Sequence, residues 1–231
     1  AWRVNKVASA IGKGTTYLEI GVQYGYTLRD VTIPFKWGVD PSPHFRLSTL
    51  PEGVRVSQVD SDTFFDNLPA NLAFDLAFID GLHEFRQTYR DVINVLSHLD
   101  PGGAILVDDV IPVDAASAEP THESCLRMRA ELGLSSSRWQ GDVFRLIPLL
   151  LAVHPELEVA LIGSNNEGDS PQALIRLRER SQPWNGAAAD EDQMRLFAEL
   201  TFEDVFVTGR YLEAFSVTTF EEVLNRWSTC S

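Results

Sequence analysis

The chain has little of what holds small secreted or metal-bound domains together. It contains two cysteines in 231 residues, Cys125 and Cys230, and they form no CxxC pair. This usage predicts neither a disulfide framework nor a zinc site, and the default compartment is a reducing cytoplasm.

Long apolar runs and positive charge are also scarce. No run of about 18 apolar residues occurs, and the first residues lack a signal-peptide pattern. Lys and Arg number 19 against 33 Asp and Glu, a net charge of -14 that repels phosphate backbones and anionic lipids. We therefore expect no nucleic acid and no membrane partner, but a small neutral or cationic substrate. The sequence leaves a homo-oligomer open.

Alternating strands and helices fill the first half of the chain. Between Tyr17 and Asp109, five short apolar segments alternate with helical or loop segments: TYLEIGV, FKWGVD, VRVSQVD, AFDLAFID and AILVDD. Near-continuous apolar strands in such an order are typical of a parallel sheet covered on both faces. The predicted fold class is doubly wound α/β, Rossmann-like.

The second half gives a weaker pattern. Helices are expected near 122–132 and at 146–153, and strands at 157–162 and 173–177 would form an antiparallel hairpin around the polar loop SNNEGDSP. The hairpin would complete a mostly parallel, seven-stranded sheet. We assign residues 1–179 to one domain and 180–231 to a helical C-terminal extension that forms a lid or a subunit contact.

The segment YLEIGVQYG indicates a nucleoside site. Its strand ends in Glu19, and Gly21 and Gly25 space the loop that follows, so backbone N–H groups and a carboxylate can surround a nucleotide-like ligand. About twenty residues later, Asp40 ends the next strand, where a ribose needs an acceptor for two hydroxyls.

These strand ends, with FIDGLH and the later GG and DD motifs, resemble class I S-adenosylmethionine-dependent methyltransferases over residues 15–177. The resemblance implies that the loop from Glu19 to Gly25 wraps the methionine end of S-adenosylmethionine and that Asp40 binds its ribose. Gln23 departs from the glycine that many relatives carry. Asp62 would lie near the adenine amino group, with Phe64 as the apolar neighbour. Alternatively, Asp62 caps the helix that it begins.

Three carboxylates follow the fourth and fifth strands. Asp80 ends one strand and Asp108 and Asp109 end its neighbour, and adjacent strands lie only about 4.8 Å apart. Clustered acids repel one another unless a cation lies among them, and Mg²⁺ takes oxygen ligands. The chain also resembles metal-dependent sugar and catechol O-methyltransferases. Those enzymes carry acids at these positions. The sugar enzymes read Asp-Gly-Asp where this chain reads Asp80-Gly81-Leu82-His83.

His83 is the candidate base. It lies three residues beyond Asp80, where catechol-type enzymes carry a lysine, and an imidazole with an ordinary pKa near 6.5 accepts a proton at neutral pH. Asp80 is the alternative base, and His83 could instead serve only to begin a helix. Trp139 to Arg145 (WQGDVFR) either shapes the acceptor pocket or forms a turn.

The leading hypothesis is a methyltransferase that uses S-adenosylmethionine, assisted by Mg²⁺, to methylate a hydroxyl of a sugar or a catechol-like ring. Two alternatives remain. One is a catalytically silent module with the same fold, because a fold does not establish an activity. The other is an NAD-dependent oxidoreductase, which the absence of a GxGxxG motif disfavours.

Overall fold

A computed structural model describes residues 1–163 and 170–228. One large sheet runs through the molecule in the order β3-β2-β1-β4-β5-β7-β6-β8. Its strands are β1 (Thr16–Ile20), β2 (Phe35–Val39), β3 (Val54–Ser57), β4 (Phe74–Ile79), β5 (Leu99–Val107), β6 (Leu157–Gly163), β7 (Gln172–Leu177) and β8 (Val217–Thr219). The doubly wound, Rossmann-like α/β fold is confirmed.

The strands β3, β2, β1, β4 and β5 are parallel, and β7 is antiparallel to both β5 and β6. The hairpin expected from the sequence is therefore present. Most of the loop that joins its strands, 164–169, lies outside the described residues. All five parallel strands end at one rim of the sheet, and β7 begins there.

The predicted count of seven strands is wrong, because β8 adds an eighth beside β6. Val217 to Thr219 pair in parallel with Leu161 to Gly163. A three-residue strand has no measurable period, so a segment flanked by helical patterns gave no sign of it. The segment assigned as a helical extension thus also supplies one edge of the sheet.

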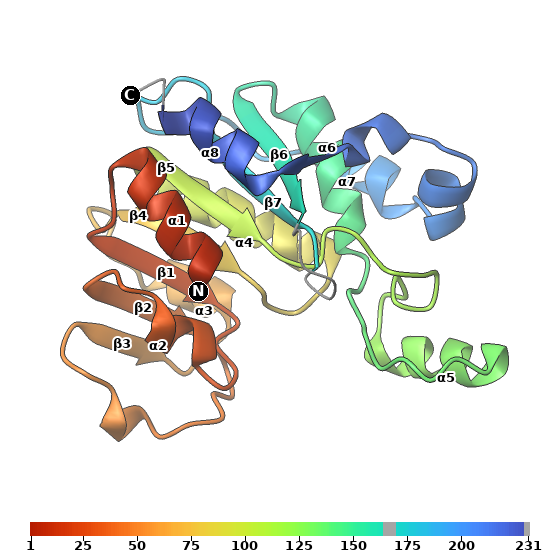
Figure 1. Ribbon diagram of the computed structural model, residues 1–231, viewed down its shortest axis with the longest axis horizontal. Coiled ribbons are helices and arrows are strands. Elements are labelled where there is room, and N and C mark those ends of the chain that lie inside the picture. Colours follow the sequence, from red (N-terminus) through yellow and green to blue (C-terminus); the bar gives the residue numbers. More distant parts are fainter. Residues whose placement is uncertain (164–169, 229–231) are drawn as a thin grey trace.

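Helices cover both faces of the sheet (Figure 1). On one face lie α3 (Ser61–Asp66), α4 (Phe85–Ser97), α6 (Leu146–Val153) and α7 (Glu191–Ala198), and on the other lie α1 (Trp2–Ile11), α2 (Tyr26–Asp30) and α8 (Phe220–Ser228). The periodicity behind α4 is real, since Tyr89, Val92 and Leu96 all point into the core. The N-terminal helix α1 was not expected from the sequence.

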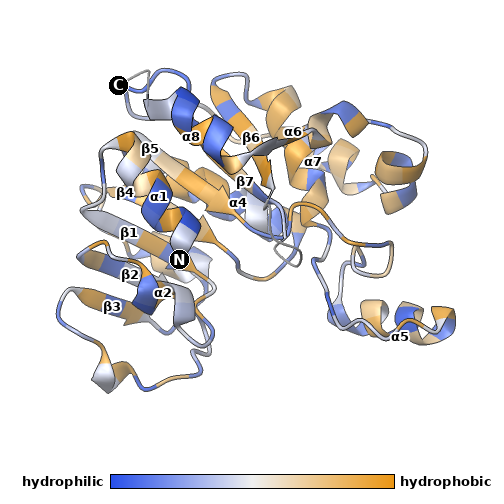
Figure 2. Ribbon diagram, viewed as in Figure 1, coloured by the Kyte–Doolittle hydropathy of each residue, from blue (hydrophilic) through white to orange (hydrophobic). Residues whose placement is uncertain are grey.

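The central strands are apolar on both sides, as the sequence pattern indicated (Figure 2). Every residue of β4 is buried. Alternate residues enter the two cores: Ala77 and Ile79 pack against the α4 side, and Leu76 and Phe78 against the α1 side. Double burial holds β4 and β5 firmly, so the residues that follow them start from fixed positions.

One helix, α5 (His122–Leu132), extends away from the sheet at the end of a long connection (Figure 1). Cys125 belongs to this helix and is buried, while Cys230 lies outside the described residues. In the two described ranges, no helix is long and apolar enough to cross a membrane.

Candidate active site

A cavity of about 270 Å³ opens at the rim where β1, β2 and β4 end. Gly21 and Asp40 line it together with Ile20, Val39, Pro41, Val59, Asp60, Ser61, Gly81, Leu82, Gln87 and Asp91. This is the crevice at the carboxyl ends of parallel strands where doubly wound folds bind nucleotides. We call it the rim cavity.

Gly21 joins the rim cavity to the loop after β4. Its φ is +86°, and a β-carbon there would lie 1.8 Å from the backbone oxygen of Asp80. No side chain fits that contact, so the glycine follows from the close approach of two loops. The loop after β1 and the loop after β4 are thereby fixed against each other.

Asp40 lies in the rim cavity with both carboxylate oxygens directed by backbone groups. One oxygen accepts the N–H of Gln23 at 2.7 Å and the other that of Ser42 at 2.7 Å. A carboxylate offers about four lone-pair sites, so two hydroxyls can still bind. Gln23 has a φ of +44°, a conformation that suits the glycine of many relatives.

Four other predicted cofactor residues are not among those that line the rim cavity: Glu19, Gly25, Asp62 and Phe64. Gly25 instead lines a separate cavity of about 70 Å³. Glu19 is buried and accepts a hydrogen bond from Tyr17 at 2.8 Å. Its burial is the main cause of a raised pKa of about 7. Phe64 is buried in the core. Asp62 accepts from Gln87 at 3.2 Å. Their roles toward the cofactor stay predictions.

The capping alternative for Asp62 is wrong, because Asp60 caps α3. The Asp60 carboxylate accepts the N–H of Thr63 at 2.7 Å. The sequence placed the helix cap two residues late. Asp60 also lines the rim cavity, as do Gln87 and Asp91 of α4, which sequence reasoning missed. Gln87 and Asp91 are four residues apart and so share one face of the helix. This spacing was the only sign in the sequence that both could reach the same cavity.

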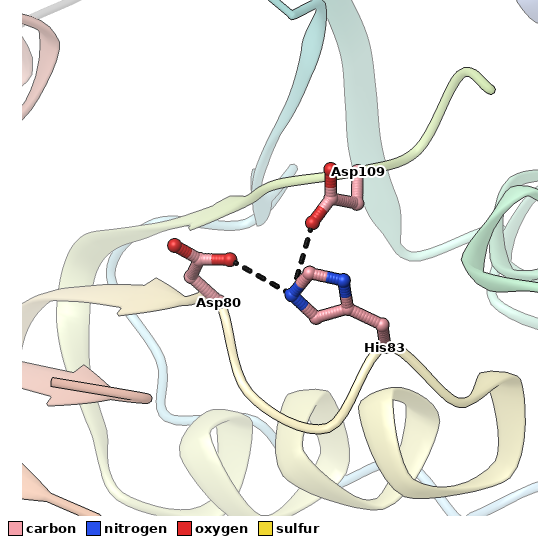
Figure 3. Close-up of side chains that lie close together, drawn as sticks. All are labelled: Asp80, His83 and Asp109. Atoms are coloured by element: carbon pink, nitrogen blue, oxygen red, sulfur yellow. Dashed lines mark ion pairs between the residues drawn. The ribbon is translucent and has the colours of Figure 1, made fainter. Parts of the chain in front are cut away.

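Three side chains converge beside the rim cavity: Asp80, His83 and Asp109 (Figure 3). His83 Nε2 lies 3.4 Å from Asp80 Oδ1 and 3.2 Å from Asp109 Oδ2. The imidazole thus occupies the position between carboxylates where the sequence argument required a cation. Asp80 is the more accessible acid, with 36% of its side chain exposed against 13% for Asp109.

The backbone at this cluster is in an uncommon conformation. His83 and Asp109 have φ values of +58° and +61°, which residues other than glycine seldom adopt. Such conformations persist where surrounding contacts impose them, and they gather at functional sites. Here they turn two loop side chains toward Asp80.

The cluster retains a proton above neutral pH. Burial opposes the charge on His83, but the hydrogen bond to Asp80 and the charge of Asp109 outweigh it and raise its pKa to about 9. Burial raises the pKa of Asp109 to about 8, against the lowering effect of His83. The pKa of His83 is therefore well above the ordinary value on which the sequence argument rested.

Trp139 to Asp142 hold His83 in place. The Trp139 carbonyl lies 3.2 Å from His83 Nδ1, and the two rings stack with centroids 5.1 Å apart. A β-carbon at Gly141 would lie 1.8 Å from the His83 backbone oxygen. Asp142 accepts the N–H of Phe85 at 2.6 Å, where α4 begins. The turn interpretation is correct for the backbone, and the turn also orients the histidine.

Asp108 turns away from the cluster. Its Oδ2 accepts a hydrogen bond from Gln172 at 3.0 Å and its Oδ1 accepts the N–H of Asp109 at 2.9 Å. Burial, then the charge of Asp80, raises its pKa to about 6. Among the described residues, three groups lie close enough together to hold a metal ion, those of Asp80, His83 and Asp109. Since imidazole suits transition ions and Mg²⁺ prefers oxygen, this donor set fits a divalent transition ion better than Mg²⁺.

Comparisons with known proteins agree with this geometry. Residues 18–110 match the model of a family described as a methyltransferase domain. This segment contains Glu19, Gly21, Asp40, Asp80 and Asp109. The similarity to a methyltransferase domain thus covers this segment, which is less than half of the chain. No curated protein matches the sequence.

Solved structures share the fold of this chain. A candidate O-methyltransferase from Klebsiella pneumoniae superposes with a TM-score of 0.54 at 19% identity, over 77% of this chain and 80% of that one. Cofactor-bound Rv0187 from MTB gives 0.53 at 20% identity, over 77% and 80%. The O-methyltransferase TomG from Streptomyces achromogenes, in complex with SAM, gives 0.50 at 14% identity, over 76% and 78%.

Three cavities follow one another along the rim. Gly81 lines both the rim cavity and a narrow cavity of about 10 Å³ at Asp80, His83 and Asp109. Asp108 lines that narrow cavity and a third cavity of about 340 Å³ beyond it. Each pair of neighbouring cavities in this row thus shares one wall residue.

Proposed function

We propose that this chain transfers a methyl group from S-adenosylmethionine to a hydroxyl oxygen of a small molecule. The observation that carries the proposal is Gly81, which forms a common wall of the rim cavity and of the cavity at Asp80, His83 and Asp109. A nucleoside held at one side of this residue lies next to groups that accept a proton at the other. The net charge of -14 supports a small acceptor over a nucleic acid.

The rim cavity would hold the nucleoside. Asp40 accepts the two ribose hydroxyls, and the loop from Gly21 to Gly25 surrounds the methionine end. TomG in complex with SAM and cofactor-bound Rv0187, which share this fold, support this assignment. S-adenosylmethionine supplies a methyl group activated by its positively charged sulfur.

The cluster would receive the acceptor hydroxyl. His83 Nε2 takes its proton, while Trp139 keeps the ring oriented through Nδ1. The acceptor oxygen forms its bond to the methyl carbon as the carbon–sulfur bond breaks, and that electron pair stays on sulfur. Asp80 and Asp109 stabilise the imidazolium that results.

Proton transfer to His83 requires the neutral imidazole. With a raised pKa of about 9, His83 is protonated at neutral pH in the free chain, so kcat/KM is expected to increase with pH up to about 9.

A divalent metal ion is the alternative occupant of the cluster. Asp80, His83 and Asp109 would hold it, and it would lower the pKa of the acceptor hydroxyl.

Calorimetric titration with S-adenosylhomocysteine and, separately, with NADH tests the cofactor. We expect micromolar binding of the nucleoside and none of NADH. Binding of NADH alone would replace the proposal with the oxidoreductase alternative. Binding of neither ligand would favour the silent module.

The same titrations with EDTA, Mg²⁺, Mn²⁺ or Zn²⁺ test the metal. We expect nucleoside affinity to be the same in all four conditions, because the cluster lies outside the rim cavity. Heat of binding from Mn²⁺ or Zn²⁺ alone, lost in Asp109→Asn, is expected if the cluster holds a metal. Stronger binding of Mg²⁺ than of either transition ion would contradict the donor-set argument.

A further inference from the structure

The third cavity lies on the sheet face that α1 and α8 cover. It measures about 340 Å³, and its walls are the first turn of α1, Phe78 of β4, Leu106 and Asp108 at the end of β5, Ser170, and Gln172 at the start of β7. This volume is at the low end of small-molecule pockets, roughly 300–1,000 Å³. It suits an acceptor of one or two rings.

A row of polar side chains connects this cavity to the cluster. Ile79 pairs with Val107 and Val107 with Ala173. The residues that follow Ile79 and Val107 and precede Ala173 are therefore neighbours across the rim: Asp80, Asp108 and Gln172. Successive strands lie about 4.8 Å apart, so one small molecule can reach from the first to the third.

Gln172 has a hydrogen-bonding atom with no partner among the described residues. Its Nε2 donates to Asp108 Oδ2 at 3.0 Å, and because an ionised carboxylate only accepts, this bond fixes which way the amide points. Its Oε1 is buried without a hydrogen bond in the described part of the chain, and the residue as a whole is 9% exposed. Buried amide oxygens nearly always accept a hydrogen bond, so this one is suited to a donor on a ligand.

We infer that this cavity holds the methyl acceptor and that Gln172 Oε1 accepts a hydrogen bond from a second donor group on it, distinct from the hydroxyl that is methylated. The inference rests on the proposed function. Phe78 and Arg3 line the cavity beside Asp108, and Gln172 selects for the second hydroxyl. The acceptor class is a ring with at least two hydroxyls, either aromatic or sugar.

The test measures binding of simple probes to the full chain saturated with S-adenosylhomocysteine. Resorcinol represents aromatic diols, methyl glucoside represents sugars, and phenol is the matched probe with one hydroxyl. Binding is followed by NMR titration in the unsubstituted chain and in Gln172→Met, which removes the amide with little change in volume. We expect at least one two-donor probe to lose tenfold or more in affinity in the variant, and phenol to bind both proteins alike.

The nucleoside provides the control for folding. Gln172 does not line the rim cavity, so Gln172→Met should bind S-adenosylhomocysteine as the unsubstituted chain does. If the nucleoside binds and neither diol does, or if the diols bind both proteins equally, the inference is overturned and the proposed function stands. If the unsubstituted chain does not bind the nucleoside, the proposed function itself fails. Which diol responds distinguishes an aromatic from a sugar acceptor.

Discussion

The two ends of the row of cavities are built in different ways. On the cofactor side, Gly21 and Asp40 each follow a strand directly, and backbone contacts fix them. On the acceptor side, Asp108, Trp139 and Gln172 come from segments far apart in the sequence. The nucleoside end is therefore determined by strand ends, and the acceptor end by how distant segments pack. The first leaves a motif in a single sequence, and the second does not.

Replacing His83 should separate the two ends most clearly. Methyl transfer should stop, while binding of the nucleoside at the other end should stay intact. His83→Gln is expected to lower kcat about a hundredfold or more, because the variant has no proton acceptor at this point. Its activity should also lose the increase toward pH 9. Methyl transfer from labelled S-adenosylmethionine to the responding acceptor, measured from pH 6 to 10, gives both values.

His122→Gln is the matched control for His83. The His122 ring also lies against Trp139, with centroids 5.5 Å apart, but it belongs to α5. This variant should keep its activity within about twofold, as surface substitutions usually do. A greater loss in His122→Gln than in His83→Gln would transfer the role of base to His122.

Asp40→Ala tests the cofactor side alone. Removal of a charged acceptor for two hydroxyls is expected to raise the Kd of S-adenosylhomocysteine about 10- to 100-fold. Calorimetry measures it, and Asp66→Ala, at an exposed acid of α3, should leave the Kd unchanged. Equal affinity in Asp40→Ala and the unsubstituted chain would reject the ribose assignment.

A pair of glycines separates backbone strain from positioning of the base. Gly141 and Gly133 have φ values of +65° and +66°, but a β-carbon meets the His83 backbone only at Gly141 and meets nothing within 4 Å at Gly133. Gly133→Ala should cost about 1–2 kcal/mol in the free energy of unfolding, with normal kcat. Gly141→Ala should cost more and also lower kcat about tenfold, since small displacements of a reacting group are costly.

Chemical denaturation gives the free energy of unfolding for both glycine variants, and the methyl-transfer assay gives kcat. Equal kcat values for the two would show that the turn at Gly141 has no part in orienting His83.

The sequence supported most of the fold because apolar runs ending in acids mark buried parallel strands. It predicted the rim position of Asp80, Asp108 and Asp109, since strand ends meet at one edge. The direction of Asp108 could not be predicted, because it depends on Gln172, a residue 64 positions away. Nor could the pKa of His83 be foreseen, because it follows from a loop conformation that places one imidazole between two carboxylates. A lone glutamine at the start of a strand gives no signal at all.

Helix α8 packs against α1, with Trp2 and Phe220 in edge-to-face contact at 5.4 Å between centroids. The wall of the third cavity is therefore supported by residues that are made more than a hundred positions after those that line the rim cavity. Domains generally fold as units. The third cavity is complete only once the last helix of the described chain has been made and has packed on α1.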